Sequence, residues 1–264
     1  MRLTEDERRS YDEHGFLLRE KVFTTDEIDE LRVAAEELCR DLEATAGATR
    51  IKVSAHYVFE PDAAKDLIIK WEPGPDGVIQ GLEPVAHLHP VLTAYATHPG
   101  FVEPCRDILG LPEVGLFTEK LNVKRARVGG QYALHQDYPY WRGAAEDAER
   151  LVTVWVALDD ATADNGPLEV LPGSHRMGHV AGKTSSMEFE RNEIDPDTFD
   201  TSGMVAVEVP AGGAVFFGPY LVHRSSPNLS DVDRRALLYS YQAAGLRTQR
   251  ENTRIWLKHA PPKG

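Results

Sequence analysis

The stretch GPYLVHRSSPNLSDVDRRALLYSY, residues 218–241, contains two apolar runs separated by a polar segment rich in Ser, Asn and Asp. Apolar runs of this length, bounded by turn-forming residues, are typical of short β-strands. We therefore expect strands at 221–225 and 235–243, joined by a turn. The first of them carries His223, whose imidazole is able to bind a metal ion or to move a proton.

The same pattern of short apolar runs between turn-forming residues extends back along the chain to about residue 114. Short apolar runs alternate there with Gly, Pro, Asn and Asp. Further strands are expected at 115–126, 131–136, 151–158, 167–171, 204–209 and 214–217. Several short strands at such spacing indicate a sandwich or a barrel. The segment 174–202 is long, polar and poor in strand signals. We interpret it as a lid that carries Met187 and Phe189 over a site, or as a disordered loop.

The first third of the chain is predicted to be largely helical. Thr4 with Glu7, and Thr24 with Glu27, have the spacing of capping boxes, which begin helices. After the second box, apolar residues recur at helical spacing over about five turns. They are Ile28, Leu31, Ala34, Ala35, Leu38 and Leu42. Two further short helices are expected within 89–110, where Pro99 and Gly100 break the pattern.

Helices that precede a run of strands predict an α+β fold in which the helices buttress a double-stranded β-helix, a jelly-roll or cupin-like barrel. We expect one domain over residues 1–264, because no Ser/Gly-rich linker divides the chain. Its helical part is expected at about 1–113 and its barrel core at about 114–245.

Composition narrows the class of partner. The formal net charge of −13 favours a soluble protein and argues against broad contact with nucleic acid or anionic membranes. Two cysteines, Cys39 and Cys105, are too few for a disulfide framework and are expected to be reduced thiols. No stretch approaches the roughly 20 apolar residues of a membrane span. We therefore predict a cytoplasmic protein.

The stretch ALHQDYPYW, residues 133–141, places His135 and Asp137 two positions apart. On a β-strand such residues point to the same face, about 7 Å apart along the backbone. With His223 from a distant strand they would form a triad of two histidines and one carboxylate, which holds non-haem Fe(II) and leaves three coordination positions open. The alternative is a surface pair, because the motif is short.

A competing third ligand is His175, in the motif PGSH. We expect this histidine to lie in a tight turn, where it caps or hydrogen-bonds. The remaining candidates His87, His89 and His179 are interpreted as solvated or structural.

An Fe(II) site that activates dioxygen needs two further electrons, which a 2-oxo acid is able to supply. The far carboxylate of such a cosubstrate needs a fixed cation, and the fork of an arginine binds carboxylates in two places. Arg234 and Arg235 lie 11 and 12 residues after His223. Only one of them can face inward, and strand parity leaves the choice open.

The motifs LHQD, NGPLEVLPGSH and HRSSPNLSDVDRR occur in this order. Together they resemble the phytanoyl-CoA dioxygenase family of Fe(II)- and 2-oxoglutarate-dependent oxygenases, over about residues 10–245. The resemblance implies a double-stranded β-helix core, and it implies that Arg234 and Ser225 hold the 2-oxoglutarate carboxylate. The metal ligands that it implies are His135, Asp137 and His223.

Further cosubstrate residues are suggested by the strand EKLNVK, in which Lys120, Asn122 and Lys124 share one face. Similar positions of the family touch 2-oxoglutarate, and Asn122 is the first choice. The lysines are equally explained as solvated strand residues. Thr153, which shares a strand face with Trp155, is a weaker candidate. The aromatic residues Tyr138, Tyr140 and Trp141 are interpreted as a substrate wall or as a packed barrel rim.

The reaction implied is hydroxylation of a small molecule with release of succinate and CO2, with O2 as the oxidant. In the halogenating members of this superfamily Ala or Gly replaces the carboxylate ligand. The presence of Asp137 therefore favours hydroxylation or desaturation. The alternatives are a non-catalytic cupin-like protein that binds a metal or ligand, a family member that acts on an acyl-CoA, and a zinc hydrolase.

Overall fold

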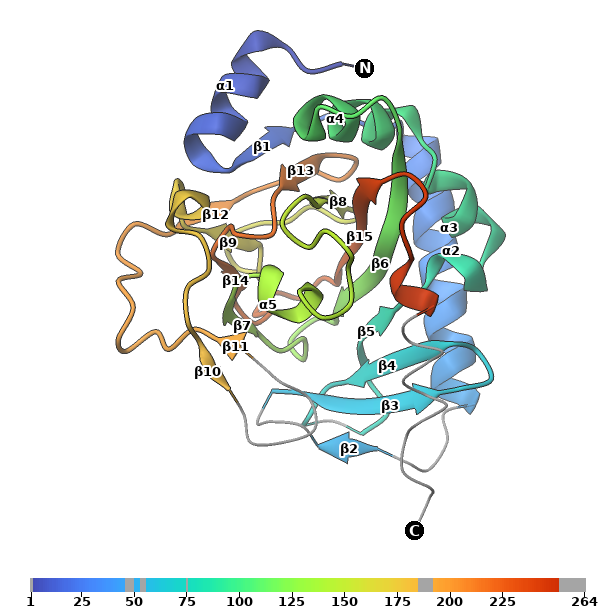
Figure 1. Cartoon of the computed structure of the whole chain (residues 1–264). Coiled ribbons are helices and arrows are strands. Elements are labelled where there is room, and N and C mark those ends of the chain that lie inside the picture. The colour runs from blue at the N-terminus through green and yellow to red at the C-terminus, as the bar shows by residue number, and fades with distance from the viewer. Residues whose placement is uncertain (1, 46–49, 53–55, 75, 185–191, 252–264) are drawn as a thin grey trace.

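Two antiparallel sheets face each other in the computed structural model (Figure 1). The structure describes residues 2–45, 50–52, 56–74, 76–184 and 192–251. The larger sheet has nine strands in the order β1-β13-β8-β15-β6-β5-β4-β3-β2. Their bounds are β1 Phe16–Arg19, β2 Ile51–Lys52, β3 Val58–Asp62, β4 Leu67–Trp71, β5 Ile79–Glu83, β6 Val114–Lys124, β8 Val152–Ala157, β13 Ala214–Phe217 and β15 Arg234–Ala243.

The smaller sheet has four strands in the order β12-β9-β14-β7. Their bounds are β7 Tyr132–His135, β9 Leu168–Val170, β12 Val205–Val207 and β14 His223–Ser225. If the eight strands from β6 to β15 in these two sheets are counted one to eight in chain order, the large sheet reads 6-3-8-1 and the small sheet 5-4-7-2. Strands that alternate in this way between two sheets make a jelly roll. The predicted α+β fold with a double-stranded β-helix is confirmed.

Strand alternation separates the inside of the barrel from its outside. On β8, Val154 and Val156 pack with the helices, whereas Trp155 and Ala157 pack between the two sheets. Successive side chains of a strand point to opposite faces of the sheet, so a strand buried on both faces contributes alternate residues to two cores. On β15, Leu237 likewise belongs to the helical side.

Helices cover the outer face of the large sheet (Figure 1). They are α1 Glu5–His14, α2 Thr25–Thr45, α3 Pro90–Tyr95 and α4 Pro99–Leu109, with a 3-10 turn η1 at Ala86–Leu88. Both predicted capping boxes are present, with Glu7 N 3.2 Å from Thr4 Oγ1 and Glu27 N 3.3 Å from Thr24 Oγ1. The apolar stripe predicted for α2 is buried in full. None of the helices in the described ranges has the length and apolar character needed to cross a membrane.

The region before residue 113 is less helical than its sequence suggests. Residues 46–85, which carried no clear pattern, contribute strands β2 to β5, and these extend the large sheet beyond β6. Gly81 of β5 has no side chain, and its backbone pairs with Asn122 of β6. A Cβ at Gly81 would lie 3.2 Å from the hydroxyl of Tyr132. This extension adds side chains of β3, β4 and β5 to the wall of a cavity in the barrel.

The segment 174–202 contains more structure than expected. It includes the 3-10 turn η2 Ser174–Met177 and a small hairpin, β10 Lys183–Thr184 with β11 Asn192–Glu193. Ile194 follows β11, donates a backbone hydrogen bond to Leu134 of β7 at 2.8 Å and is buried. Part of the segment therefore lies beside the strand that carries His135. Met187 and Phe189, predicted to close over the site, lie outside the described residues.

Candidate active site

Three side chains meet between β7 and β14, as the sequence predicts. His135 and His223 are register partners across the two strands, and their ring centroids are 4.1 Å apart. The Nε2 atom of His135 lies 3.9 Å from Oδ1 of Asp137. One ligand atom from each of these residues lies within 4.8 Å of the others. Within the described part of the chain, His135, Asp137 and His223 are the histidine and carboxylate side chains whose ligand atoms lie close enough together to hold a metal ion.

The backbone conformation that positions Asp137 differs from the predicted β-strand. β7 ends at His135, and Asp137 has a helical backbone, with φ −73° and ψ −31°. It directly precedes the short helix α5, Tyr138–Trp141. The strand argument for a shared face therefore fails at the last residue. The turn into α5 nevertheless brings the carboxylate back beside His135.

Hydrogen bonds to the backbone orient both imidazoles. Nδ1 of His135 lies 2.7 Å from the carbonyl of Ala133, and Nδ1 of His223 lies 2.9 Å from the carbonyl of Leu221. A carbonyl only accepts, so Nδ1 carries a proton in each ring, and in the neutral imidazole Nε2 is then the nitrogen with the lone pair. Metal-binding histidines are commonly fixed in this way. Two neutral imidazole nitrogens and one carboxylate form the donor set of non-haem Fe(II) sites, so these residues fit ferrous iron.

A cavity of about 670 Å³ opens over the three ligands, and residues from both sheets line it. This size is within the usual range of small-molecule sites. Of the predicted residues, ten line it: Lys120, Asn122, His135, Asp137, Tyr140, Trp141, His223, Ser225 and Arg234, together with Trp155. Thr153 and Tyr138 are not among them. The Thr153 hydroxyl is buried 2.9 Å from that of Ser240, and Tyr138 packs against Tyr220.

Arg234 is a buried cation on the cavity wall. Only 1% of it is exposed, and its guanidinium lies over the ring of Trp155, 5.6 Å from the centroid. Burial lowers its pKa to about 10. Its Nε atom has no hydrogen-bond partner in the described part of the chain. A buried N–H without an acceptor is costly, so this atom indicates an anion that completes the site, and the carboxylate of 2-oxoglutarate fits it.

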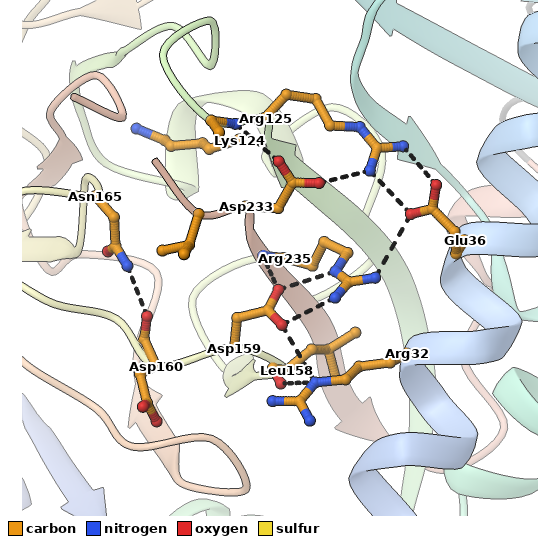
Figure 2. Close-up of polar contacts among 12 residues, drawn as sticks. Arg32, Glu36, Lys124, Arg125, Leu158, Asp159, Asp160, Asn165, Asp233 and Arg235 are labelled. Carbon is orange, nitrogen blue, oxygen red and sulfur yellow. Dashed lines mark hydrogen bonds and ion pairs between the residues drawn. The ribbon is translucent and has the colours of Figure 1, made fainter. Parts of the chain in front are cut away.

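The neighbouring arginine faces the other way. Arg235 forms two contacts of 2.9 Å with the carboxylate of Asp159 and one of 3.5 Å with Glu36 of α2. Figure 2 shows this guanidinium among Asp159, Glu36 and Arg125, on the helical side of the sheet. The two arginines therefore point to opposite faces of β15. Arg234 faces the cavity and Arg235 faces the helices, a choice that the sequence leaves open.

The face shared by Lys120, Asn122 and Lys124 on β6 is not uniform. Asn122 lines the cavity, and its Oδ1 accepts a hydrogen bond of 3.1 Å from the Tyr132 hydroxyl. Lys124 is fully buried, does not line the cavity and donates to the carbonyl of Ser226. Burial, with Arg234 nearby, lowers the pKa of Lys124 to about 6. Neither lysine is a solvated strand residue, because the Lys120 side chain is only 18% exposed.

The other histidines that the sequence offered as candidates lie apart from the three ligands. His175 packs on Gly15, where a Cβ would approach its Nδ1 within 2.4 Å. His87 and His89 contact backbone groups, the carbonyl of Lys65 and the N–H of Val91. His179 packs beside Tyr138 at 5.6 Å between centroids. The interpretation of His87, His89 and His179 as solvated or structural remains a prediction.

Several cavity residues lie outside the sequence predictions. Those with charged side chains are Lys70 and Glu83, from β4 and β5, together with Arg142, Glu193 and Arg224. The extension of the sheet places the first two there, and the sequence of residues 46–85 carried no clear strand signal.

The jelly roll, the two-histidine-one-carboxylate group and the buried arginine together define the class of Fe(II)- and 2-oxoglutarate-dependent oxygenases. The model of the phytanoyl-CoA dioxygenase family matches residues 11–236. The chain therefore belongs to this family, whose cofactors are iron and 2-oxoglutarate, and it is an oxidoreductase of the dioxygenase type.

Individual relatives differ in what they act on. The L-proline trans-4-hydroxylase of Streptomyces griseoviridis is 34% identical over 163 residues, which cover 54% of this chain and 59% of the relative. The ectoine dioxygenase of Bordetella bronchiseptica is 27% identical over 91% of this chain and 76% of the relative. The crystal structure of EctD from S. alaskensis with 2-oxoglutarate and 5-hydroxyectoine superposes with a TM-score of 0.70. It is 25% identical and covers 91% of this chain and 76% of that one.

Proposed function

We propose that this protein hydroxylates an unactivated C–H bond of a free small molecule, using Fe(II), 2-oxoglutarate and O2, with release of succinate and CO2. The observation that carries the proposal is the meeting of His135, Asp137 and His223 in the same cavity as the buried guanidinium of Arg234. A protein that merely binds a metal has no use for that arginine, and neither has a zinc hydrolase.

Each residue has a separate task in this proposal. His135, Asp137 and His223 hold ferrous iron, with both imidazoles fixed by the backbone carbonyls behind them. Arg234 binds the far carboxylate of 2-oxoglutarate, and Ser225, which is 7% exposed and lines the same cavity, donates its hydroxyl to it. Asn122 is assigned a weaker contact, because its Oδ1 already accepts from Tyr132.

Bound iron and 2-oxoglutarate supply the electrons that activate dioxygen. The protein supplies placement and a dry site. Trp155, Phe217 and Leu168 line the cavity with apolar surface, which keeps water from the reacting atoms. Asp137 occupies the position at which halogenating relatives lack a carboxylate. We therefore propose hydroxylation, or the related desaturation, over halogenation.

An anaerobic titration tests the proposal. Fe(II) and 2-oxoglutarate are added to the metal-free protein under argon, and the weak visible charge-transfer absorption of the complex is followed. Air is then admitted and succinate is measured. We expect a saturable band and slow succinate formation without added substrate. A protein that shows neither is a non-catalytic binder, and the proposal is then wrong.

A further inference from the structure

Gln136 stands between two of the proposed metal ligands, and it is 0% exposed. Its Nε2 donates to the carbonyl of Gly178 at 2.8 Å and to that of Tyr220 at 2.7 Å. Its Oε1 accepts from the backbone N–H of Val180 at 2.9 Å. Both protons and the oxygen of this buried amide are therefore engaged, and each of them by a backbone group.

The three hydrogen bonds join segments that are distant in the sequence. Gly178 and Val180 follow the turn η2 and come 42 and 44 residues after Gln136. Tyr220 comes 84 residues after Gln136 and three positions before His223. One side chain therefore connects the turn between the first two ligands, the segment after η2 and the backbone that leads into β14.

The backbone pairing of the small sheet ends before Asp137. β7 pairs with β14 at His135 and His223, and β7 ends at His135. Asp137 lies two residues further on, in a helical turn. The position of its carboxylate relative to His223 therefore depends on how this turn is attached to the chain before β14. The amide of Gln136 makes that attachment, because it bonds to the carbonyl of Tyr220.

Packing reinforces the same connection. Leu134 and Val222 directly precede the two histidines and are buried in one apolar cluster. Val180 packs against this cluster, and the N–H of Val222 donates to the hydroxyl of Ser174 at 2.9 Å. A position that served packing alone is better filled by an apolar side chain, because burial of an amide costs free energy that its hydrogen bonds must offset. The hydrogen bonds of Gln136 therefore indicate a role beyond packing.

We propose that Gln136 is a positioning residue for ferrous iron. Its amide fixes the turn after β7 to the backbone before β14, and so it sets how far the carboxylate of Asp137 lies from the imidazole of His223. Gln136 is not among the residues that line the cavity, so it acts through the ligands and not on the substrate. This inference rests on the proposed function, because it takes the three ligands as the metal group.

The first test measures Fe(II) affinity in Gln136→Met. Methionine has nearly the length of glutamine and makes none of its hydrogen bonds. We expect Fe(II) affinity to fall by about 10- to 100-fold, as it commonly does when a residue that supports metal ligands is lost. Affinity for 2-oxoglutarate at saturating Fe(II) should change by no more than about twofold, because Arg234 lies on β15 in the other sheet. Competition with a chromophoric chelator under argon measures the first affinity, and the visible band measures the second.

Gln242→Met is the matched control. Gln242 is also 0% exposed, and its Nε2 also donates to two backbone carbonyls, those of Leu246 at 3.3 Å and Arg247 at 2.9 Å. It lies on β15 and does not line the cavity. Both variants should lower the midpoint of urea unfolding, but Gln242→Met should leave Fe(II) affinity within about twofold. An equal loss of Fe(II) affinity in the two variants would show that Gln136 acts only through general stability, and would overturn the inference.

A second measurement needs no variant. The N–H of Val180 bonds to Gln136, so its hydrogen exchange reports on the attachment. Exchange of the peptide that contains Val180 is followed by mass spectrometry under argon, with and without Fe(II). Iron fixes the ligands and thereby the turn, so we expect Fe(II) to slow exchange at Val180 by about tenfold. This protection should be lost in Gln136→Met. Exchange at one rate with and without Fe(II) counts against the inference.

The outcomes separate the two proposals. Unaltered Fe(II) affinity in Gln136→Met, together with normal succinate formation, overturns the positioning role and leaves the proposed function standing. Absence of Fe(II) binding in the unaltered protein overturns the metal group itself, and both proposals are then wrong. If Gln136→Met does not fold, the exchange of Val180 in the unaltered protein decides.

Discussion

At the scale of single residues, the site depends on which atom of each side chain is presented. The carbonyls of Ala133 and Leu221 hold the protons on Nδ1 of the two histidines and so leave Nε2 for the metal. Asp137 is 6% exposed and supplies the negative charge of the group. Removal of any one of the three leaves two ligands, which are too few to hold Fe(II) firmly.

We expect His135→Ala and Asp137→Ala each to abolish succinate formation and to lower Fe(II) affinity by about 10- to 100-fold or more. His175→Ala is the control, because this histidine packs on Gly15 and not on the metal group. Iron binding measured by anaerobic titration checks the first expectation. Full activity in either ligand variant would remove the basis of the metal assignment.

The paired arginines give a second expectation. Arg234→Ala should raise the concentration of 2-oxoglutarate needed for half-maximal activity by about 10- to 100-fold, because a charged, buried hydrogen-bond donor is lost. Iron affinity should change little. Arg235→Ala, whose guanidinium contacts Asp159 and Glu36, should leave the 2-oxoglutarate requirement unaltered. The measurement is a 2-oxoglutarate saturation curve for each variant, and the reverse result would move the anchor to Arg235.

At the scale of elements, α2 supports the barrel from outside. Its buried face includes Leu31, which is 1% exposed, whereas Val33 on the same helix is 57% exposed. Polar contacts reinforce the packing, because Glu36 of α2 meets Arg125 and Arg235 at the ends of β6 and β15 (Figure 2). The strand β15 carries Arg234 on its other face, so α2 and the buried arginine of the cavity contact the same strand.

Leu31→Ala is expected to lower the free energy of unfolding by about 2–5 kcal/mol, since it removes a buried side chain and leaves a cavity. Val33→Ala should change it by no more than about 0.5 kcal/mol. Urea denaturation followed by tryptophan fluorescence measures both. Equal losses in the two variants would contradict the packing of α2 against the large sheet.

At the scale of the whole molecule, one buried carboxyl couples stability to pH. Burial raises the pKa of Glu119 on β6 from 4.5 to about 7. The folded state therefore favours the protonated acid, and this contribution is complete below about pH 4.5 and is lost as the pH rises through 7. Its Oε1 accepts from the N–H of Ala86 at 2.9 Å, which links the sheet to η1.

Glu119→Gln imitates the protonated acid. We expect it to unfold with up to about 3 kcal/mol more free energy than the unaltered protein at pH 8, and the difference should shrink as the pH falls to 4.5. The exposed Glu113, next to the start of the same strand, provides the control variant Glu113→Gln. Unfolding is measured in urea from pH 4.5 to 8. Parallel curves for Glu119→Gln and the unaltered protein would show that Glu119 ionises as freely in the folded protein as in the unfolded one.

The sequence by itself determined the long helices and the barrel strands, and it pointed to the three side chains that meet between β7 and β14. Capping boxes at Thr4 and Thr24 and the apolar stripe of α2 specify helices through contacts within a few residues, and alternation specifies the barrel strands in the same way. His135 and His223 were recognisable because their motifs are local. These features could be predicted from residue spacing and motifs because each of them lies within one short segment of the chain.

Tertiary structure alone decided the rest. Strand parity could not choose between Arg234 and Arg235, because the answer depends on which face of β15 meets the barrel interior and which meets α2. Asp137 reaches the metal group through a helical turn and not along a strand. The contacts of Lys70 and Lys120 with Glu83 require β4, β5 and β6 to pair in register. Such contacts arise from long-range pairing, whose free energy no single segment of the chain contains.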